Sequence, residues 1–436
     1  MKKTEVGLIP DDWEVKTLGD LFVMKAGGDV DKKHFSSFKN TIFKYKIFSN
    51  GLENEGIYGY TDFPKYKGNA ITITGRGTVG VSMYRKEDFD AVIRLLVLNS
   101  KHEKTTDNFF ISELINSFVK FPNESTGVPQ LTVPQIKNIQ IPLPSFKEQQ
   151  RIAKALSDVD AVISTIELLI QKKKNIKQGT MQQLLTGKKR LPGFATTSKF
   201  KQTELGEIPE DWEVIQVNGN YFLKGRIGWQ GLKASEFIDK GPYLVTGTDF
   251  ENGKVNWNTC YHISEKRYEE DKALHVQNDD LLITKDGTVG KVAYIDKKPE
   301  KVSLNSHLLI IRPLKKNLIN RFLYYILNSK YFFDYYQQTQ TGTTMASLSQ
   351  EKISKFMYPL PSKEEQTAIA NVLSSMDKEI ETLTTKLEKY RNLKTAMMQQ
   401  LLTGKIRLST SKTAETEKQN KATEKVTEKA TEKGEK

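Results

Sequence analysis

Two copies of one pattern occupy most of the chain, and this internal repeat constrains the fold more than any other feature. The segment Ile-Pro-Asp-Asp-Trp at 9–13 recurs at 208–212 as Ile-Pro-Glu-Asp-Trp. Residues 142–191 align without a gap to residues 359–408, and 26 of these 50 positions are identical. A repeat of this length predicts two similar folding units within a single chain.

The two copies differ in length over only part of the repeat. The first motif recurs after 199 residues, the Gly-Thr-Val-Gly segment at 77–80 recurs after 210, and the block at 142–191 recurs after 217. The changes in length therefore fall between residues 15 and 142, while the flanking segments keep their register. This distribution favours a fixed scaffold that carries two variable domains.

The fixed part of each copy has the heptad pattern of a long helix. Apolar residues recur over residues 146–185 and again 217 residues later, with a spacing that places them on one helix face. Lys173, Lys177 and Lys394 interrupt this face, which indicates an imperfect coil. We expect the coiled-coil seam to contain Ile152, Leu156, Val159, Ile163, Ile166 and Ile170 in the first copy, and Ile369, Leu373, Met376, Ile380, Leu383 and Leu387 in the second.

Prolines precede both helical patterns, and Gly187 and Gly404 stand where the helices are expected to end. A helix of about 40 residues spans about 60 Å. Each apolar stripe needs a partner, and the simplest arrangement pairs the two helices with each other as an antiparallel coiled coil. The alternative is that each helix packs onto its own domain.

The predicted fold class is mixed α/β, with two pseudo-repeated domains that are each followed by a long helix. Short apolar runs at 70–74 and 280–284 predict strands, and residues 108–120 and 320–337 predict helices. Residues 409–436 repeat Thr-Glu-Lys and lack an apolar face, so we expect a disordered low-complexity tail. The predicted boundaries are 1–145 for the first domain with its N-terminal anchor, 146–190 for the first helix, 191–202 for a linker, 203–362 for the second domain with the repeated anchor, and 363–408 for the second helix.

A glycine-rich segment at 75–80 matches the dinucleotide-binding pattern G-x-G-x-x-G. The residues after it favour another strand, whereas a dinucleotide site needs a helix there. The second copy also replaces the first glycine by Lys285. We therefore predict a tight hairpin in each domain, with Arg76 at the tip of the first and Lys285 at the tip of the second. Each cation either contacts DNA or is simply solvated at a plain turn.

The composition excludes several classes of protein. The chain has 66 Lys and Arg against 53 Asp and Glu, and its net charge of +13 favours a polyanionic partner, nucleic acid before membrane. A single cysteine, Cys260, excludes an intrachain disulfide and a cysteine-rich zinc module. We find neither an apolar leader nor a run of 18 apolar residues, so we expect a cytoplasmic protein. We recognise no catalytic or metal-binding motif in the sequence, and we therefore predict no catalytic residue and no metal site.

Taken together, these motifs resemble the specificity (S) subunit of type I restriction-modification systems. The resemblance covers residues 4–408 and depends on the order and duplication of the motifs. Its carriers are the doubled Ile-Pro-x-Asp-Trp-Glu-Val anchor, the doubled Gly-Thr-Val-Gly turn, Pro-Leu-Pro-Ser-x-x-Glu-Gln at 142–149 and 359–366, and Gln-Gln-Leu-Leu-Thr-Gly at 182–187 and 399–404.

This resemblance implies that two target recognition domains each bind half of a split site on double-stranded DNA, at a separation set by the coiled coil. It also implies modification (methyltransferase) subunits, two in number, that bring S-adenosylmethionine, and restriction subunits that use ATP and Mg. The chain itself would hold no cofactor and carry out no chemistry. The alternatives are a stand-alone sequence-specific or architectural DNA-binding protein, and a single-chain nuclease.

Recognition domains vary within this family, so the resemblance assigns no base-contacting residue. We choose candidates by position, from hairpin tips and polar loop positions. The predicted DNA-binding residues are Lys25, Ser49, Asn50, Arg76 and Thr78 in the first domain, and Lys224, Arg226, Thr248, Lys285 and Thr288 in the second.

Overall fold

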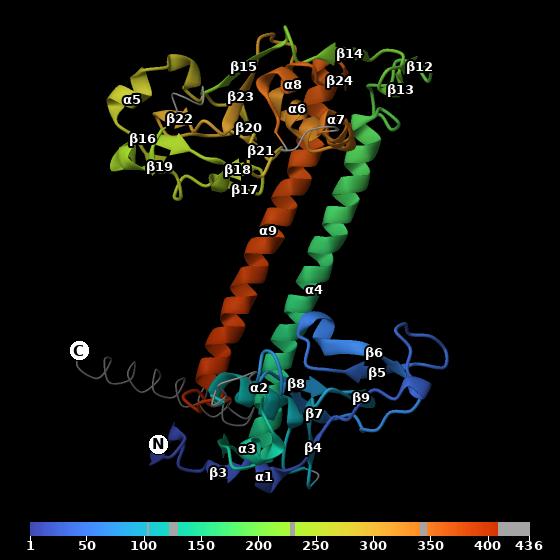
Figure 1. Cartoon of the computed structure of the whole chain (residues 1–436), viewed down its shortest axis with the longest axis vertical. Coiled ribbons are helices and arrows are strands. Elements are labelled where there is room, and N and C mark those ends of the chain that lie inside the picture. Colours follow the sequence, from blue (N-terminus) through green and yellow to red (C-terminus); the bar gives the residue numbers. More distant parts are fainter. Residues whose placement is uncertain (103, 122–129, 227–231, 341–346, 409–436) are drawn as a thin grey trace, which may run out of the picture. The chain divides into compact units, whose positions relative to one another are not determined.

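A computed structural model describes residues 1–102, 104–121, 130–226, 232–340 and 347–408. The chain divides into two compact units (Figure 1). The first unit combines Met1–Glu167 with Thr385–Lys436, and the second is Leu168–Thr384. Each unit therefore contains one copy of the variable domain together with parts of both long helices.

The first unit is a mixed α/β structure. Its four-stranded antiparallel sheet has the order β4-β10-β7-β8, and its three-stranded sheet has the order β6-β5-β9, in which β5 and β9 are parallel. The elements before the long helix are β1 (Lys2–Thr4), β2 (Gly7–Ile9), β3 (Glu14–Thr17), α1 (Leu18–Leu21), β4 (Phe22–Ala26), β5 (Tyr45–Phe48), β6 (Ile57–Thr61), β7 (Ala70–Ile73), β8 (Ser82–Arg85), β9 (Phe89–Ala91), β10 (Leu96–Ser100), α2 (Asn108–Phe118), α3 (Val133–Lys137) and β11 (Gln140–Leu143).

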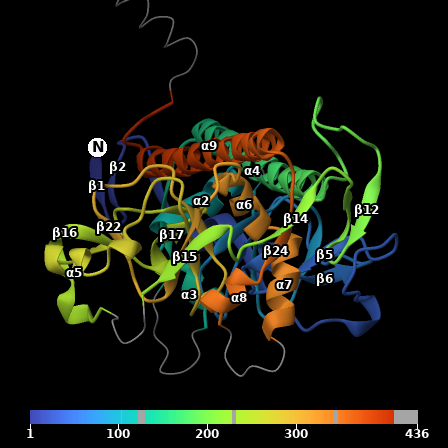
Figure 2. The ribbon, with the colours of Figure 1, turned by 90° about the horizontal axis from the view of Figure 1, so that it is seen from above.

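The second unit repeats this topology. Its four-stranded sheet has the order β15-β23-β20-β21, and its three-stranded sheet has the order β19-β16-β22, again with one parallel pair. The elements are β12 (Phe200–Thr203), β13 (Gly206–Pro209), β14 (Glu213–Gln216), β15 (Tyr221–Gly225), β16 (Ile238–Val245), β17 (Phe250–Glu251), β18 (Lys254–Val255), β19 (Tyr261–His262), α5 (Glu265–Glu269), β20 (Leu281–Thr284), β21 (Val292–Tyr294), β22 (Val302–Leu304), β23 (Leu308–Pro313), α6 (Asn320–Leu327), α7 (Lys330–Gln340), α8 (Gln350–Ser354) and β24 (Met357–Leu360). In this unit, α5 lies beside β16 and β22 (Figure 2).

The predicted helix at 320–337 is two helices. Asn328 ends α6, where its backbone N–H bonds the carbonyls of Tyr324 and Tyr325. Ser329 then accepts a hydrogen bond from the backbone of Tyr331 at 3.3 Å, at the start of α7. Asn and Ser favour helix ends because their side chains compete for backbone hydrogen bonds, and the aromatic periodicity concealed this break.

The long helices are α4 (Phe146–Leu185) and α9 (Lys363–Leu401). They end before the predicted limits of 190 and 408. Gly187 and Gly404 follow with φ of +69° and +66°, a left-handed conformation that suits glycine and stops a helix. Every predicted seam residue is buried or half-buried: Ile152, Leu156, Val159, Ile163, Ile166 and Ile170 on α4, and Ile369, Leu373, Met376, Ile380, Leu383 and Leu387 on α9.

Each unit has a main core that includes residues of both long helices. In the first unit, Leu401 and Leu402 at the end of α9 pack with Ile152 and Leu156 of α4 against the sheet and α2. In the second unit, the end of α4 and the beginning of α9 occupy the corresponding positions: Leu184, Leu185, Ile369 and Leu373. Neither variable domain is therefore completed by its own segment of sequence alone.

An arginine just beyond α4 forms ion pairs with two separate segments of the second unit. Arg190 donates to both carboxylate oxygens of Glu365, at 2.6 and 2.7 Å, and makes a bidentate pair with Asp211 at 2.8 and 3.0 Å. Its guanidinium also lies 5.3 Å from the ring of Trp212, whose Nε1 donates to Glu365. Although burial acts against the charge of Arg190, the hydrogen bonds to Glu365 and Asp211 raise its pKa, and the bond from Arg190 lowers the pKa of Asp211.

The first unit contains the corresponding pair of ion pairs, although Trp13 Nε1 makes no hydrogen bond there, and we call the arginine with its two carboxylates in each unit the arginine clasp. Arg407, just beyond α9, pairs with Glu148 at the start of α4 and makes a bidentate pair with Asp12 at 2.8 and 2.9 Å. The hydrogen bonds to Asp12 and Glu148 raise the pKa of Arg407, and the bond from Arg407 lowers the pKa of Asp12. This clasp joins residues near the two ends of the chain.

The glycine beyond each helix explains why the anchor motif is repeated. A Cβ on Gly187 would meet Pro209 at 2.4 Å and Trp212 at 3.3 Å. A Cβ on Gly404 would likewise meet Pro10 at 2.4 Å and Trp13 at 3.1 Å. The Ile-Pro-x-Asp-Trp anchor is thus the surface against which the end of each long helix rests.

We expect Arg190→Ala to lower the free energy of unfolding by about 3–5 kcal/mol, because it leaves the buried Glu365 without its partner. Arg391→Ala is the matched control, since Arg391 pairs with Glu167 where both side chains are exposed, and it should cost less than about 1 kcal/mol. Chemical denaturation of the two variants measures the difference. Equal losses would contradict the structural role of the clasp.

Candidate nucleic-acid interface

The repeated Gly-Thr-Val-Gly segments form the same loop in both units. Thr74 Oγ1 donates to the carbonyl of Thr78 and accepts from the backbone of Val81, and Thr284 makes the matching bonds to Thr288 and Lys291. The strands on either side pair antiparallel, β7 with β8 and β20 with β21. The predicted hairpin is present in each domain, but it is not a tight one, because residues 74–81 and 285–291 connect the paired strands.

In the first unit, four loops meet beyond the same end of the sheets. The side chain of Asn50, which follows β5, accepts from Gly75 N at 2.7 Å and donates to the carbonyl of Ile93 at 2.6 Å. Gly27, which follows β4, bonds the backbone of Leu95 at 2.7 Å. The approach is close, because a Cβ on Gly75 would lie 2.9 Å from the carbonyl oxygen of Arg94.

The second unit gathers the corresponding loops. Lys285, at the start of the hairpin loop, donates its backbone N–H to His307 O and accepts from Leu348, both at 2.9 Å. A Cβ on Gly247, which follows β16, would lie 2.8 Å from the Thr284 side chain. We call these two sets of loops the loop clusters: residues 27–28, 49–50, 75–80, 92–95 and 130–131 in the first unit, and 225–226, 246–248, 285–290, 305–307 and 347–348 in the second.

The structure places all five candidates of the first domain in or next to its loop cluster. Lys25 is exposed on β4, and Thr78 is exposed at the hairpin tip. Arg76 is half-buried and forms an isolated bridge with Gln130. Ser49 and Asn50 are half-buried, and both hydrogen bonds of the Asn50 amide described above are internal. Asn50 therefore positions the neighbouring loops.

The second domain places its candidates less uniformly. Thr248 and Thr288 are exposed, and Lys285 is half-buried in the hairpin loop. Lys224 lies on β15 and pairs with Asp271 at 3.3 Å. Arg226 is buried, where it bonds the carbonyl of Leu304 at 3.1 Å and the hydroxyl of Ser303 at 3.2 Å, and burial lowers its pKa.

Sequence reasoning missed the turn that enters each loop cluster between two strands, residues 92–95 and 305–308. Arg94 and His307 occupy matching, exposed positions in these turns. The two Leu-Leu pairs at 95–96 and 308–309 align the turns and are the signal that identifies the match. Among the described residues, neither Arg76 nor Arg94 has an acidic partner in an ion pair.

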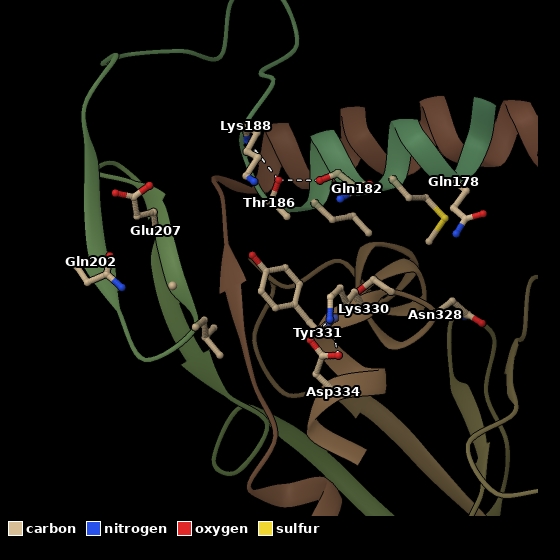
Figure 3. A pocket seen from close by; sticks show the side chains of 15 residues that line it. Gln178, Gln182, Thr186, Lys188, Gln202, Glu207, Asn328, Lys330, Tyr331 and Asp334 are labelled. Atoms are coloured by element: carbon tan, nitrogen blue, oxygen red, sulfur yellow. Dashed lines mark hydrogen bonds and ion pairs between the residues drawn. The ribbon is translucent and has the colours of Figure 1, made fainter. Parts of the chain in front are cut away.

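A cavity of about 730 Å³ lies in the second unit and is lined by residues outside the loop cluster (Figure 3). Gln178 and Gln182 line it from α4, and Thr186 lines it just beyond the end of that helix. Gln202 and Glu207 line it from the β12–β13 hairpin, and Tyr331 points into it from α7. These segments belong mainly to the fixed part of the repeat. For example, Gln182 and Thr186 recur as Gln399 and Thr403.

Within the described ranges, no group of three or more His, Cys, Asp or Glu side chains is arranged to hold a metal ion. The helices in those ranges also lack the combination of length and apolar composition that a membrane crossing requires.

Comparison with known families identifies the class of protein. The model of the type I restriction modification DNA specificity domain matches residues 10–178 and again residues 209–389. The two matches take in most of the chain and fall once on each copy of the repeat. The chain belongs to this family.

Two relatives in Methanocaldococcus jannaschii match almost end to end. The type I restriction enzyme specificity subunit MjaX is 29% identical over 94% of this chain and 97% of its own. The MjaVIII specificity subunit is 28% identical over 92% of this chain and 94% of its own length. The crystal structure of a type I restriction-modification system S subunit from M. genitalium shares the fold, with a TM-score of 0.63 at 18% identity, over 94% of this chain and 99% of that one.

The close approach of the loops predicts a selective effect of Gly75→Ala. Its methyl group would be held between two backbone carbonyls, those of Arg94 and Leu131, so we expect a loss of stability of about 1–3 kcal/mol and weaker specific DNA binding. Gly28→Ala is the control, because nothing lies within 4 Å of its Cβ position. Denaturation and DNA-binding titrations of both variants test this, and indistinguishable results would contradict the packing described.

Proposed function

We propose that this chain is the DNA-reading and scaffolding subunit of a type I restriction-modification complex, and that each loop cluster reads one half of a bipartite site. The observation that supports this most strongly is the duplication of the loop cluster: corresponding loops gather in both units, held by matching hydrogen bonds, and they carry different side chains. Family membership over both copies supports the same function.

The two half-sites should differ in sequence. The hairpin loops present Gly75-Arg76 in the first unit and Lys285-Asp286 in the second. An arginine and a lysine–aspartate pair offer different hydrogen-bond donors and acceptors, and base edges are distinguished by those patterns in the major groove. We therefore propose an asymmetric site on double-stranded DNA.

We further propose that α4 and α9 pair along their lengths as an antiparallel coiled coil that fixes the separation of the half-sites. Ion pairs between the helices support this, because the residue number falls on α4 as it rises on α9. The pairs are Lys177–Asp377 and Lys173–Glu379 in the second unit, and Glu167–Arg391 and Asp160–Lys394 in the first.

Matched positions strengthen this proposal. Lys394 and Asp160 are the counterparts of Lys177 and Asp377 at the repeat distance of 217 residues, so one ion pair occurs twice with the roles of the helices exchanged. The lysines that interrupt the seam in the sequence therefore have specific acidic partners.

The remaining chemistry is assigned to partner subunits. We propose that two modification subunits bring S-adenosylmethionine and the methyl-transfer site, and that restriction subunits bring ATP- and Mg-dependent activities. Surfaces made from the fixed part of the repeat, such as the cavity lined by Gln182 and Thr186, are suited to a partner that binds both copies. The variable loop clusters are then left for DNA.

Reconstitution tests the function. The purified chain should show negligible methyl transfer or cleavage, and addition of a modification subunit should produce methylation at one bipartite sequence. Robust methylation by the isolated chain would contradict the proposal. Tight sequence-specific binding without partners, combined with no activation of a modification subunit, would instead support a stand-alone DNA-binding protein.

A charge exchange tests the helix pairing. Lys173→Glu and Glu379→Lys should each destabilise the chain by about 0.5–1 kcal/mol, because each places like charges side by side, and the double variant should recover most of the loss. Lys154→Glu is the control for a charge change that does not involve the other helix, because Lys154 pairs with Asp158 within α4. If thermal denaturation shows additive losses in the double variant, the proposed pairing is wrong.

A further inference from the structure

The turn between β9 and β10 has an unusual backbone. Ile93 and Arg94 have φ of +55° and +59°, and the turn closes with a hydrogen bond from Leu95 N to Val92 O at 3.1 Å. Left-handed conformations are unfavourable for side chains with a Cβ, and especially for β-branched isoleucine. A strained turn of this kind persists only where its surroundings hold it.

Neighbouring loops hold the turn between β9 and β10 from both sides. On one side, Ile93 N and Arg94 N donate to the carbonyls of Gly28 and Gly27 at 2.9 and 3.0 Å. On the other side, the Asn50 amide bonds the Ile93 carbonyl, and Gly75 packs against the Arg94 carbonyl. The turn is therefore at the centre of the first loop cluster, with its backbone fixed.

The two side chains of the turn are left free to meet a ligand. Ile93 is 38% exposed, and Arg94 is exposed without an acidic partner among the described residues. A guanidinium on a rigid backbone is well suited to bidentate hydrogen bonding, because little conformational entropy is lost when it binds.

The second unit has a turn at the corresponding place, closed by corresponding hydrogen bonds, but its residues Ser306 and His307 are not left-handed as Ile93 and Arg94 are. Leu308 N bonds Asn305 O at 3.3 Å to close it, and Asn305 N bonds Val245 O at 2.9 Å. The matching bonds in the first unit are Leu95 to Val92 and Val92 to Phe48. His307 therefore occupies the position of Arg94. Corresponding turns that present different side chains are what a specificity position requires.

We propose that Arg94 determines sequence specificity in the first unit, by donating to the O6 and N7 acceptors of a guanine in the major groove. This inference depends on the function proposed above. Arginine pairs with these two acceptors at once, because its guanidinium presents two donors in a rigid fork. The central position of the turn favours a base edge over a phosphate, because loops on both sides of the turn are available for the backbone of the DNA.

Mapping the methylated sequence tests this proposal in the assembled complex with its modification subunits. Arg94→Gly removes the side chain while relieving the left-handed strain, so the fold should be kept. We expect about 10- to 100-fold weaker discrimination at one G·C pair of one half-site, with the other half-site unchanged. Arg94→Lys should restore discrimination only partly.

Lys86→Ala is the matched control, because Lys86 is an exposed cation beyond the opposite end of β8. It should leave the methylated sequence unchanged. An unchanged sequence with Arg94→Gly, or a uniform loss of affinity for all sequences, would overturn the proposal. Failure of the unaltered complex to methylate any specific sequence would instead contradict the proposed function, so the two failures are distinguishable.

Discussion

The arginine clasp is the interaction on which the rest of the structure depends. A guanidinium beyond the end of one long helix is shared between a buried glutamate at the start of the other helix and an aspartate of the anchor. In the second unit, Arg190 pairs with Asp211, which is near in sequence, and with Glu365, which is distant. In the first unit Arg407 and Asp12 come from opposite ends of the described chain, so this unit is complete only when the last turn of α9 returns to the N-terminal anchor.

This arrangement separates two tasks within one chain. The residues that build the clasps, the helix ends and the sheet order recur in both copies, because each contacts many others and a change would be felt throughout the unit. The loops beyond the sheets differ between the copies, because their backbones are held by hydrogen bonds that few side chains contribute to. A scaffold of this kind allows the loop side chains to diverge while the framework stays fixed.

Sequence reasoning recovered what is periodic or repeated. The long helices and the hairpin loops follow from local patterns and are present, and the residues predicted for the seam are buried or half-buried. It could not show that Arg226 is turned inward to Leu304, since the burial of an arginine depends on strands far away in the sequence. It also missed Arg94, because a left-handed turn at an Ile-Arg pair has no local signal and is imposed by tertiary hydrogen bonds.

The central claim is that two independent readers act at a fixed separation. The most direct measurement is the methylation rate of the assembled complex on DNA whose two half-sites are separated by every length from none to about 15 base pairs. The account predicts efficient methylation at one separation, with a steep loss on either side. Comparable rates at many separations, or on a single half-site, would contradict it.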